Sequence, residues 1–202
     1  MPTGVPNSSG LSSISLDELL SRVAARTPTP GGGSVSAIVG ALGVALAQMV
    51  LAYSAPAGSV APALAELAQE LAAARSRFTA LAEEDAASFE AVRATRRAQR
   101  EAPEDEAAAR RWEGALRKAT EVPTETARLA LRLEQQLERH RGQTKSSVGS
   151  DLVSALALLR AAREGALANV RINLEELAQA GLPHADLQAE ADRISGSDPP
   201  GA

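Results

Sequence analysis

The chain has 202 residues, of which 45% are hydrophobic and 23% charged, with a formal net charge of -4. These values are typical of one soluble globular domain whose core needs no disulfide or metal. The absence of cysteine excludes disulfide scaffolds, thiolate zinc sites, iron–sulfur clusters and cysteine nucleophiles. Because aromatic residues make up only 2% of the chain and 43 residues are alanine, the composition predicts an all-α fold.

The charge pattern argues against a nucleic-acid partner and against a metal site. Acidic residues follow and dilute the densest basic stretch, so we interpret that stretch as a solvated helix face. The two histidines, His140 and His184, lie far apart in the sequence and neither has the spacing of a ligand pair. We therefore expect neither nucleic acid nor metal. The basic stretch contains Arg93, Arg96, Arg97 and Arg100.

The N-terminal part of the chain is expected to hold a tail and one short helix. Residues 1–13 are rich in Ser, Gly, Pro and Asn and lack the basic and apolar runs of a signal peptide, so we expect a disordered tail and a cytoplasmic protein. Ser15 and Glu18 form a capping box that predicts a helix over Ser15–Ala25. The prolines and glycines of residues 27–33 end this helix.

The second predicted helix, Ser34–Ser54, is the most apolar part of the chain. Its stretch Val35–Leu51 has no charge and is close to the length that crosses a bilayer. Gln48 lies inside the stretch and no basic cluster or aromatic belt flanks it, so we favour a buried central helix of a bundle or dimer and expect no membrane. Small residues at 3/4 spacing would let neighbouring backbones approach closely: Ser36, Gly40, Gly43 and Ala47.

The remaining helices are separated by proline, glycine and polar residues. Pro103 ends the third helix, and Pro123 is expected to bend or interrupt the fourth because proline lacks a backbone N–H. Residues 195–202 are expected to be a second disordered tail, which leaves residues 14–194 as one domain. The sequence predicts an elongated bundle of about five to six helices around a central apolar helix. Since an alanine-rich core is shallow, one copy of the chain would bury little apolar surface, and we expect an oligomer. The later helices are predicted over Val60–Arg100, Glu104–Arg139, Asp151–Gln179 and Pro183–Ile194.

Asp85 breaks the apolar pattern of the third helix. Apolar residues recur there every seven positions, which predicts a seam of a bundle, and Asp85 occupies one of these positions between Phe78 and Val92. A desolvated carboxylate has a raised pKa and can exchange a proton near neutral pH. A buried aspartate that caps or pairs with a neighbouring helix is the alternative interpretation.

Polar residues also interrupt the apolar stripe of the fifth helix. Asn169 and Asn173 lie one turn apart on a half-buried face and are expected either to face a flat polar heterocycle or to bond across a helix interface. Asp151 begins this helix, where a carboxylate favours the helix dipole.

The segment that precedes the apolar helix is rich in proline and glycine. Taken alone, Gly31, Gly32, Gly33 and Ser34 resemble a flexible linker. Because Pro30 precedes them and a helix follows, their backbone amides are also suited to approach a ligand, and the helix N-terminus favours an anion. No Gly-Lys-Ser/Thr follows, so nucleotide hydrolysis is not supported.

Four segments resemble the C-terminal domain of the formiminotransferase-cyclodeaminase family, which includes methenyltetrahydrofolate cyclohydrolases. The segments occur in the same order as in the family, and the resemblance covers about residues 15–180. The proline–triple-glycine motif and the Asn-Val-x-Ile-Asn motif are the most specific parts. The segments are PTPGGGSVSAIVGALGVALAQMV (28–50), EEDAASFEAV (83–92), KATEVP (118–123) and SDLVSALALLRAAREGALANVRINLEEL (150–177).

The resemblance implies an all-helical homodimer that binds a reduced folate as its substrate, with no further cofactor. It implies either hydrolysis of 5,10-methenyltetrahydrofolate to 10-formyltetrahydrofolate or closure of 5-formiminotetrahydrofolate with loss of ammonia. Asp85 matches the family's proton donor and acceptor. The glycine turn from Pro30 to Ser34, together with Asp151, Asn169 and Asn173, is expected to contact the folate. A non-catalytic helical dimer that keeps the fold, with or without folate binding, is the alternative.

Overall fold

The computed structural model describes residues 10–55 and 62–196, and within these ranges every regular element is a helix, as predicted. Six of the elements are α-helices and three are short 3₁₀ turns. The α-helices are α1 (Leu16–Ala24), α2 (Gly32–Ser54), α3 (Pro62–Glu101), α4 (Glu106–His140), α5 (Gly149–Gln179) and α6 (Ala185–Ser195), and the turns are η1 (Leu11–Ser13), η2 (Arg141–Gln143) and η3 (Ser146–Val148).

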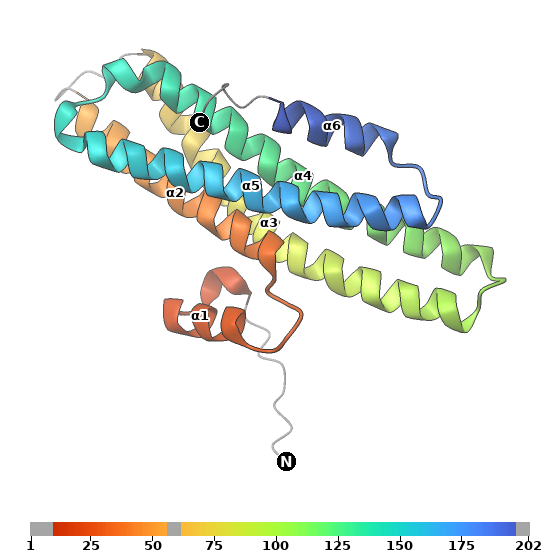
Figure 1. Cartoon of the computed structure of the whole chain (residues 1–202). Helices are drawn as coiled ribbons and strands as arrows, with labels where there is room; N and C mark the ends of the chain where they lie inside the picture. Colours follow the sequence, from red (N-terminus) through yellow and green to blue (C-terminus); the bar gives the residue numbers. More distant parts are fainter. Residues whose placement is uncertain (1–9, 56–61, 197–202) are drawn as a thin grey trace.

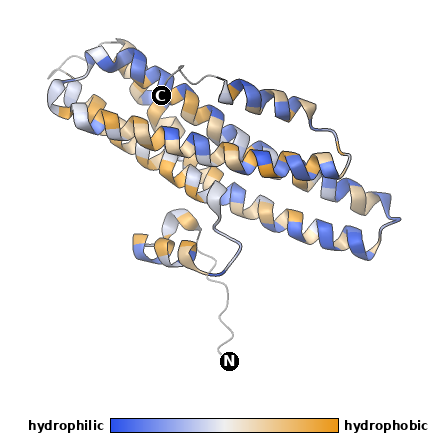
Figure 2. Cartoon of the chain, viewed as in Figure 1, coloured by the Kyte–Doolittle hydropathy of each residue, from blue (hydrophilic) through white to orange (hydrophobic). Residues whose placement is uncertain are grey.

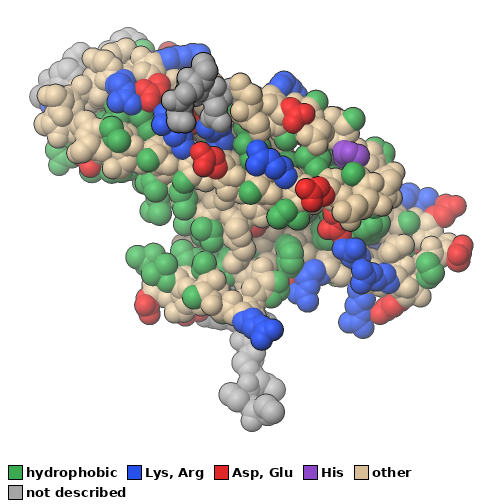
Figure 3. Space-filling view, viewed as in Figure 1, with side chains coloured by type: hydrophobic (Ala, Val, Ile, Leu, Met, Phe, Trp, Pro, Cys, Tyr) green, Lys and Arg blue, Asp and Glu red, His purple; other side chains and the backbone are tan. Residues whose placement is uncertain are grey.

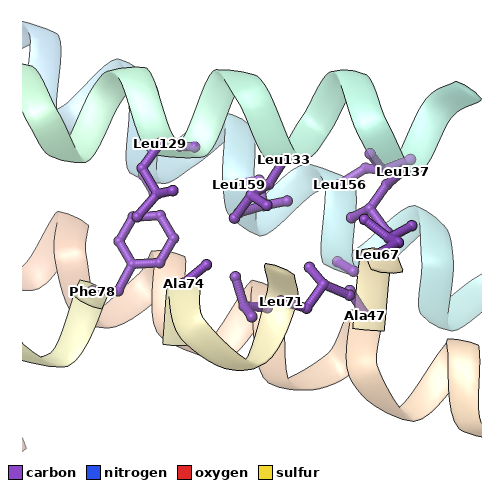
Figure 4. Packing of buried hydrophobic residues seen from close by; sticks show 14 of the residues in the cluster. Ala47, Leu67, Leu71, Ala74, Phe78, Leu129, Leu133, Leu137, Leu156 and Leu159 are labelled. Atoms are coloured by element: carbon purple, nitrogen blue, oxygen red, sulfur yellow. The ribbon is translucent and has the colours of Figure 1, made fainter. Parts of the chain in front are cut away.

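Four long helices, α2 to α5, lie side by side as an elongated bundle (Figure 1). Both α2 and α4 pack against α3 and α5, which places α3 and α5 at opposite corners. The short helix α6 packs on α4 and α5, and α1 lies outside the bundle beside α2 (Figure 1). Leucines and one phenylalanine of α3, α4 and α5 fill the centre, as Figure 4 shows for Leu71, Phe78, Leu133 and Leu159.

The small residues of α2 let its neighbours approach closely, as the sequence predicts. Ser36, Gly40, Gly43 and Ala47 are all buried. A Cβ added at Gly40 would lie 2.7 Å from Cε1 of Phe78 on α3. A Cβ added at Gly43 would lie 3.1 Å from the backbone oxygen of Ala155 on α5. Larger side chains at these positions would push the helices apart.

Within one chain α2 is one corner of the bundle and not its centre, and a central position of this helix in a dimer stays a prediction. Leu42 and Tyr53 are 56% and 62% exposed on the outer face of the helix. By length and composition alone, α2 is long and apolar enough to cross a membrane. Of its most apolar 18-residue stretch, 44% is buried against other described parts of the chain. In Figure 2 the most continuous hydrophobic colouring lies on this helix.

The helix ends differ from the prediction in particular places. Ser15 caps α1 as predicted, by accepting a hydrogen bond from the backbone N–H of Glu18 at 3.2 Å. Residues 11–13 are not a disordered tail but a 3₁₀ turn, because the backbone N–H of Ser12 donates to Glu83 Oε1 at 3.0 Å. Ser195 belongs to α6. The rest of both predicted tails, residues 1–9 and 197–202, and the start of the predicted third helix lie outside the described residues.

Helix α4 runs through Pro123 without the expected interruption. Proline has no N–H, so the backbone oxygen of Ala119, four residues earlier, loses its usual partner within the helix. The side-chain Nδ2 of Asn173 on α5 donates a hydrogen bond to this oxygen at 2.8 Å. A side chain of the neighbouring helix thus replaces the bond that Pro123 cannot make.

Candidate functional site

A groove opens between α3 and α5 where α2 begins. Gly33 of α2 is level with Asp85 of α3, and Gly32 is level with Asn169 of α5. Beyond these contacts α3 continues for about 24 Å and α5 for about 15 Å at 1.5 Å per residue, with no α2 between them. The groove holds a cavity of about 290 Å³. The residues that line it are Pro28, Thr29, Gly31, Gly32, Gly33, Asp85, Ser88, Phe89, Val92, Ala119, Asn169, Ile172, Asn173 and Glu176.

The carboxylate of Asp85 lies directly against the first turn of α2. A Cβ added at Gly33 would lie 2.1 Å from Asp85 Oδ1, so only glycine fits there. The hydroxyl of Ser34, which is 0% exposed, donates a hydrogen bond to Asp85 Oδ2 at 2.8 Å. The glycine and the serine therefore fix the carboxylate at the end of the groove.

Burial raises the pKa of the Asp85 carboxyl above its ordinary value, and the hydrogen bonds from Ser34 partly offset this rise. Asp85 is half-buried and lines the cavity, so its carboxyl group is within reach of a bound molecule. The partial positive charge at the N-terminus of α2 favours the ionised form. These opposing effects suit a group that both takes up and releases a proton.

Both predicted asparagines line the cavity, and each also makes a structural hydrogen bond. Nδ2 of Asn169 donates to the backbone oxygen of Gly165 at 2.8 Å, and Nδ2 of Asn173 makes the bond to α4 described above. The expected bond across a helix interface is thus confirmed for Asn173. Among the described residues neither side-chain oxygen has a hydrogen-bond partner, so both remain able to accept from a ligand.

The predicted glycine turn forms one wall of the groove. Gly31, Gly32 and Gly33 line the cavity, and Pro30 is buried behind them. Asp151 is not brought to this cavity. It lies in the first turn of α5, about five turns and about 27 Å along the helix from Asn169.

Several residues of the groove were not predicted from the sequence. Phe89 and Ile172 stand at its rim, 42% and 63% exposed, and offer apolar faces to a ring. Glu176 lines the far end, where Arg96 of α3 forms an ion pair with it. The Arg96 guanidinium also lies 5.9 Å from the centre of the Trp112 ring of α4. Arg96 of α3 therefore contacts side chains of both α4 and α5.

The titratable side chains that line the cavity are carboxylates, those of Asp85 and Glu176. In residues 10–55 and 62–196, no group of three or more His, Asp or Glu side chains is placed to hold a metal ion. Ordinary acid–base chemistry and hydrogen bonding are what these side chains offer to a bound molecule.

The fold and the groove define an all-helical domain with a cavity that has the Asp85 carboxylate at one end and Glu176 at the other. Residues 15–192 match the formiminotransferase-cyclodeaminase family, and the chain belongs to this family of folate-dependent cyclodeaminases and cyclohydrolases.

Similar proteins include enzymes of both kinds. Formimidoyltransferase-cyclodeaminase of Mus musculus is 34% identical over 182 residues, which are 88% of this chain and 33% of the mouse protein. The chain therefore spans about a third of that relative's length. Methenyltetrahydrofolate cyclohydrolase of Methylorubrum extorquens is 30% identical over 164 residues, 77% of this chain and 79% of that protein.

A solved structure supports the fold. The crystal structure of formiminotetrahydrofolate cyclodeaminase from Thermotoga maritima superposes with a TM-score of 0.79 at 28% sequence identity. The superposition covers 92% of this chain and 90% of that chain.

Proposed function

We propose that this protein hydrolyses 5,10-methenyltetrahydrofolate to 10-formyltetrahydrofolate or closes 5-formiminotetrahydrofolate with loss of ammonia, with Asp85 as the general acid and base. The observation that carries the proposal is the half-buried Asp85 carboxyl, with its raised pKa, at the end of a groove in a member of this family. Both reactions pass through a tetrahedral carbon between N5 and N10 of the folate.

In the hydrolysis, water adds to the cationic methenyl carbon while the Asp85 carboxylate takes one of its protons. The N5–carbon bond then breaks as N5 receives the proton from Asp85. The new hydroxyl group gives its remaining proton to solvent, and the carbon that carries the new oxygen stays on N10 as a formyl group. In the ring closure, N10 attacks the protonated formimino carbon, and Asp85 takes the proton from N10 and gives it to the new amino group. The bond between this group and the carbon then breaks, ammonia leaves, and the carbon remains as the cationic methenyl bridge. One carboxyl group that holds and returns a proton serves either sequence.

The position of Asp85 also suits the charge of these intermediates. An ionised carboxylate next to the methenyl bridge stabilises its positive charge, and this interaction is stronger inside a groove than in water. Ser34 keeps Oδ2 occupied at 2.8 Å. Oδ1 lies next to Gly33, which has no side chain.

We also propose that a second copy of the chain covers the exposed face of α2. That helix has no charged residue, and its outer apolar residues follow helical spacing, so a twofold contact brings like surfaces together. The apolar side of α1 lies next to this face, and hydrophobic side chains gather there in Figure 3. The residues concerned are Leu42, Met49 and Tyr53 of α2 and Leu16, Leu20 and Val23 of α1.

Two assays with the purified protein separate the two reactions. We expect faster loss of the absorbance of 5,10-methenyltetrahydrofolate than in buffer, or release of ammonia from 5-formiminotetrahydrofolate. Rates equal to the buffer rates in both assays would contradict the enzymatic function, and folate binding without turnover would support a non-catalytic protein.

A further inference from the structure

Glu176 is an acidic group of the groove to which the proposed proton transfer assigns no task. It lies on the same face of α5 as Asn169 and Asn173, since positions seven and three residues apart face the same way on a helix. Its side chain is 26% exposed. A carboxylate in this position has to serve packing, charge balance or recognition.

Glu176 lies some distance along α5 from Asp85, the end of the groove where the proposed reaction occurs. Glu176 is about 10 Å further along the helix than Asn169, which lies beside the first turn of α2 and therefore close to the level of Asp85. This length fits a fused two-ring heterocycle together with one hydrogen bond of about 3 Å. A ring system that reacts at Asp85 would therefore present its opposite edge to Glu176.

The carboxylate of Glu176 is held in place but is not saturated. Nη1 of Arg96 donates to Oε1, and the contact of Arg96 with Trp112 fixes the guanidinium. Oε2 has no hydrogen-bond partner among the described residues, and Oε1 has a second lone pair. Glu176 can therefore accept two further hydrogen bonds while Arg96 holds its carboxylate at the wall of the cavity.

We propose that Glu176 recognises the 2-amino group and the N3–H of the reduced pterin, and so selects the substrate of the proposed function, on which this inference rests. These two donors stand side by side on one edge of the ring, and a carboxylate presents two acceptors at matching spacing. An asparagine or glutamine in the same place would offer one donor and one acceptor, which do not match. Arg96 acts as a positioning residue for Glu176.

The test compares binding of two stable probes, 5-formyltetrahydrofolate and its 2-desamino-2-methyl analogue, by isothermal titration calorimetry. The wild-type protein is expected to prefer the 2-amino probe about 10- to 100-fold, the value of a hydrogen bond to a charged group. Glu176→Gln is expected to reduce this preference to less than about 3-fold, and Glu176→Asp, which retracts the carboxylate, to an intermediate value. Glu175→Gln, on the exposed side of the same helix, is the matched control and is expected to keep the full preference.

A second readout separates recognition from chemistry. With 5,10-methenyltetrahydrofolate, Glu176→Gln is expected to raise KM and to leave kcat within a few-fold of wild type, because the residue does not touch the reacting carbon. The role of Glu176 would be overturned if Glu176→Gln kept the wild-type preference for the 2-amino probe, or if the wild type showed no such preference. If the wild type still turns over folate in that case, the proposed function stands. Failure of the wild type both to bind the 2-amino probe and to turn over folate would overturn both proposals.

Discussion

Gly33 of α2 and Asp85 of α3 are in such close contact that a Cβ on residue 33 would lie 2.1 Å from Asp85 Oδ1. One heptad away, Gly40 and Phe78 have the same relationship, and the added Cβ would lie 2.7 Å from the ring. The same spacing that packs an aromatic ring against α2 in the core thus places a carboxylate against the N-terminus of α2 in the groove. The site continues the bundle seam to the point where α2 begins.

The first prediction concerns this contact. Gly33→Ala is expected to displace the Asp85 carboxyl and to reduce kcat/KM at least 10-fold, because a methyl group and the carboxylate cannot occupy the same space. Gly114→Ala is the control, since nothing lies within 4 Å of a Cβ added at this exposed position of α4. We expect Gly114→Ala to raise the free energy of unfolding by about 0.5–1 kcal/mol, as helix propensity predicts, and to leave activity unchanged. Equal kinetics in the two variants would contradict the account.

The second prediction concerns the hydrogen bond from Asn173 to the backbone oxygen of Ala119. Asn173→Ala is expected to lower the free energy of unfolding by about 1–3 kcal/mol, because it leaves a buried carbonyl without its donor. In a Pro123→Ala background the new backbone N–H of residue 123 bonds to Ala119, so the cost of Asn173→Ala should fall. Urea denaturation of the four proteins measures this coupling. The same cost in both backgrounds would show that Asn173 does not replace the missing bond.

The third prediction follows from the raised pKa of Asp85. The folded state holds the Asp85 proton more tightly than the unfolded state, so the wild type loses stability as the pH rises through this raised pKa. Below the ordinary value of 3.8 the carboxyl is protonated in both states and the cost disappears. Asp85→Asn is therefore expected to be more stable than the wild type at pH 7.5. The difference in the free energy of unfolding between the two proteins should become smaller as the pH falls toward 4.

Thermal unfolding over this pH range tests the third prediction. Glu90→Gln, a change of the same kind at an exposed position of α3, should show no such gap. An Asp85→Asn protein less stable than the wild type at pH 7.5 would mean that a favourable interaction of the charged carboxylate outweighs its burial.

The fourth prediction concerns the exposed face of α2. Leu42→Glu is expected to give a monomer at micromolar concentration where the wild type is a dimer, because the substitution would bury a carboxylate in an apolar contact. Ala178→Glu, at an exposed position near the end of α5, should leave the dimer intact. Light scattering measures the mass of each protein, and a monomeric wild type would contradict the proposed interface.

Periodicity was sufficient to predict much of the fold and one key residue of the candidate site. The seven-residue spacing places Asp85 on the seam, and the 3/4 spacing of the small residues predicts the close packing of α2. The same reasoning points to Glu176, which continues the stripe of Asn169 and Asn173 at helical spacing. It was missed because a charged residue near a helix end is ordinarily solvated.

Other features depend on contacts that no local pattern contains. The bond between Ser34 and Asp85 joins residues from two helices, and so does the bond that allows α4 to pass through Pro123. Low helix propensity predicts a loop for Gly32 and Gly33, but both belong to α2 because the helix must pack closely on Asn169 and Asp85. Asp151 lies in a segment that resembles the family, but the helix predicted over Asp151–Gln179 already separates it from Asn169 by about five turns, and α5 confirms this separation.

The central claim is that Asp85 carries the proton in the reaction, and the decay of 5,10-methenyltetrahydrofolate absorbance tests it most directly. The wild type and Glu90→Gln are expected to accelerate the decay well above the buffer rate, and Asp85→Asn is expected to lose at least about 100-fold in kcat, the lower range of general acid–base catalysis. An Asp85→Asn protein that folds as the wild type does and hydrolyses the substrate at the wild-type rate would contradict the claim.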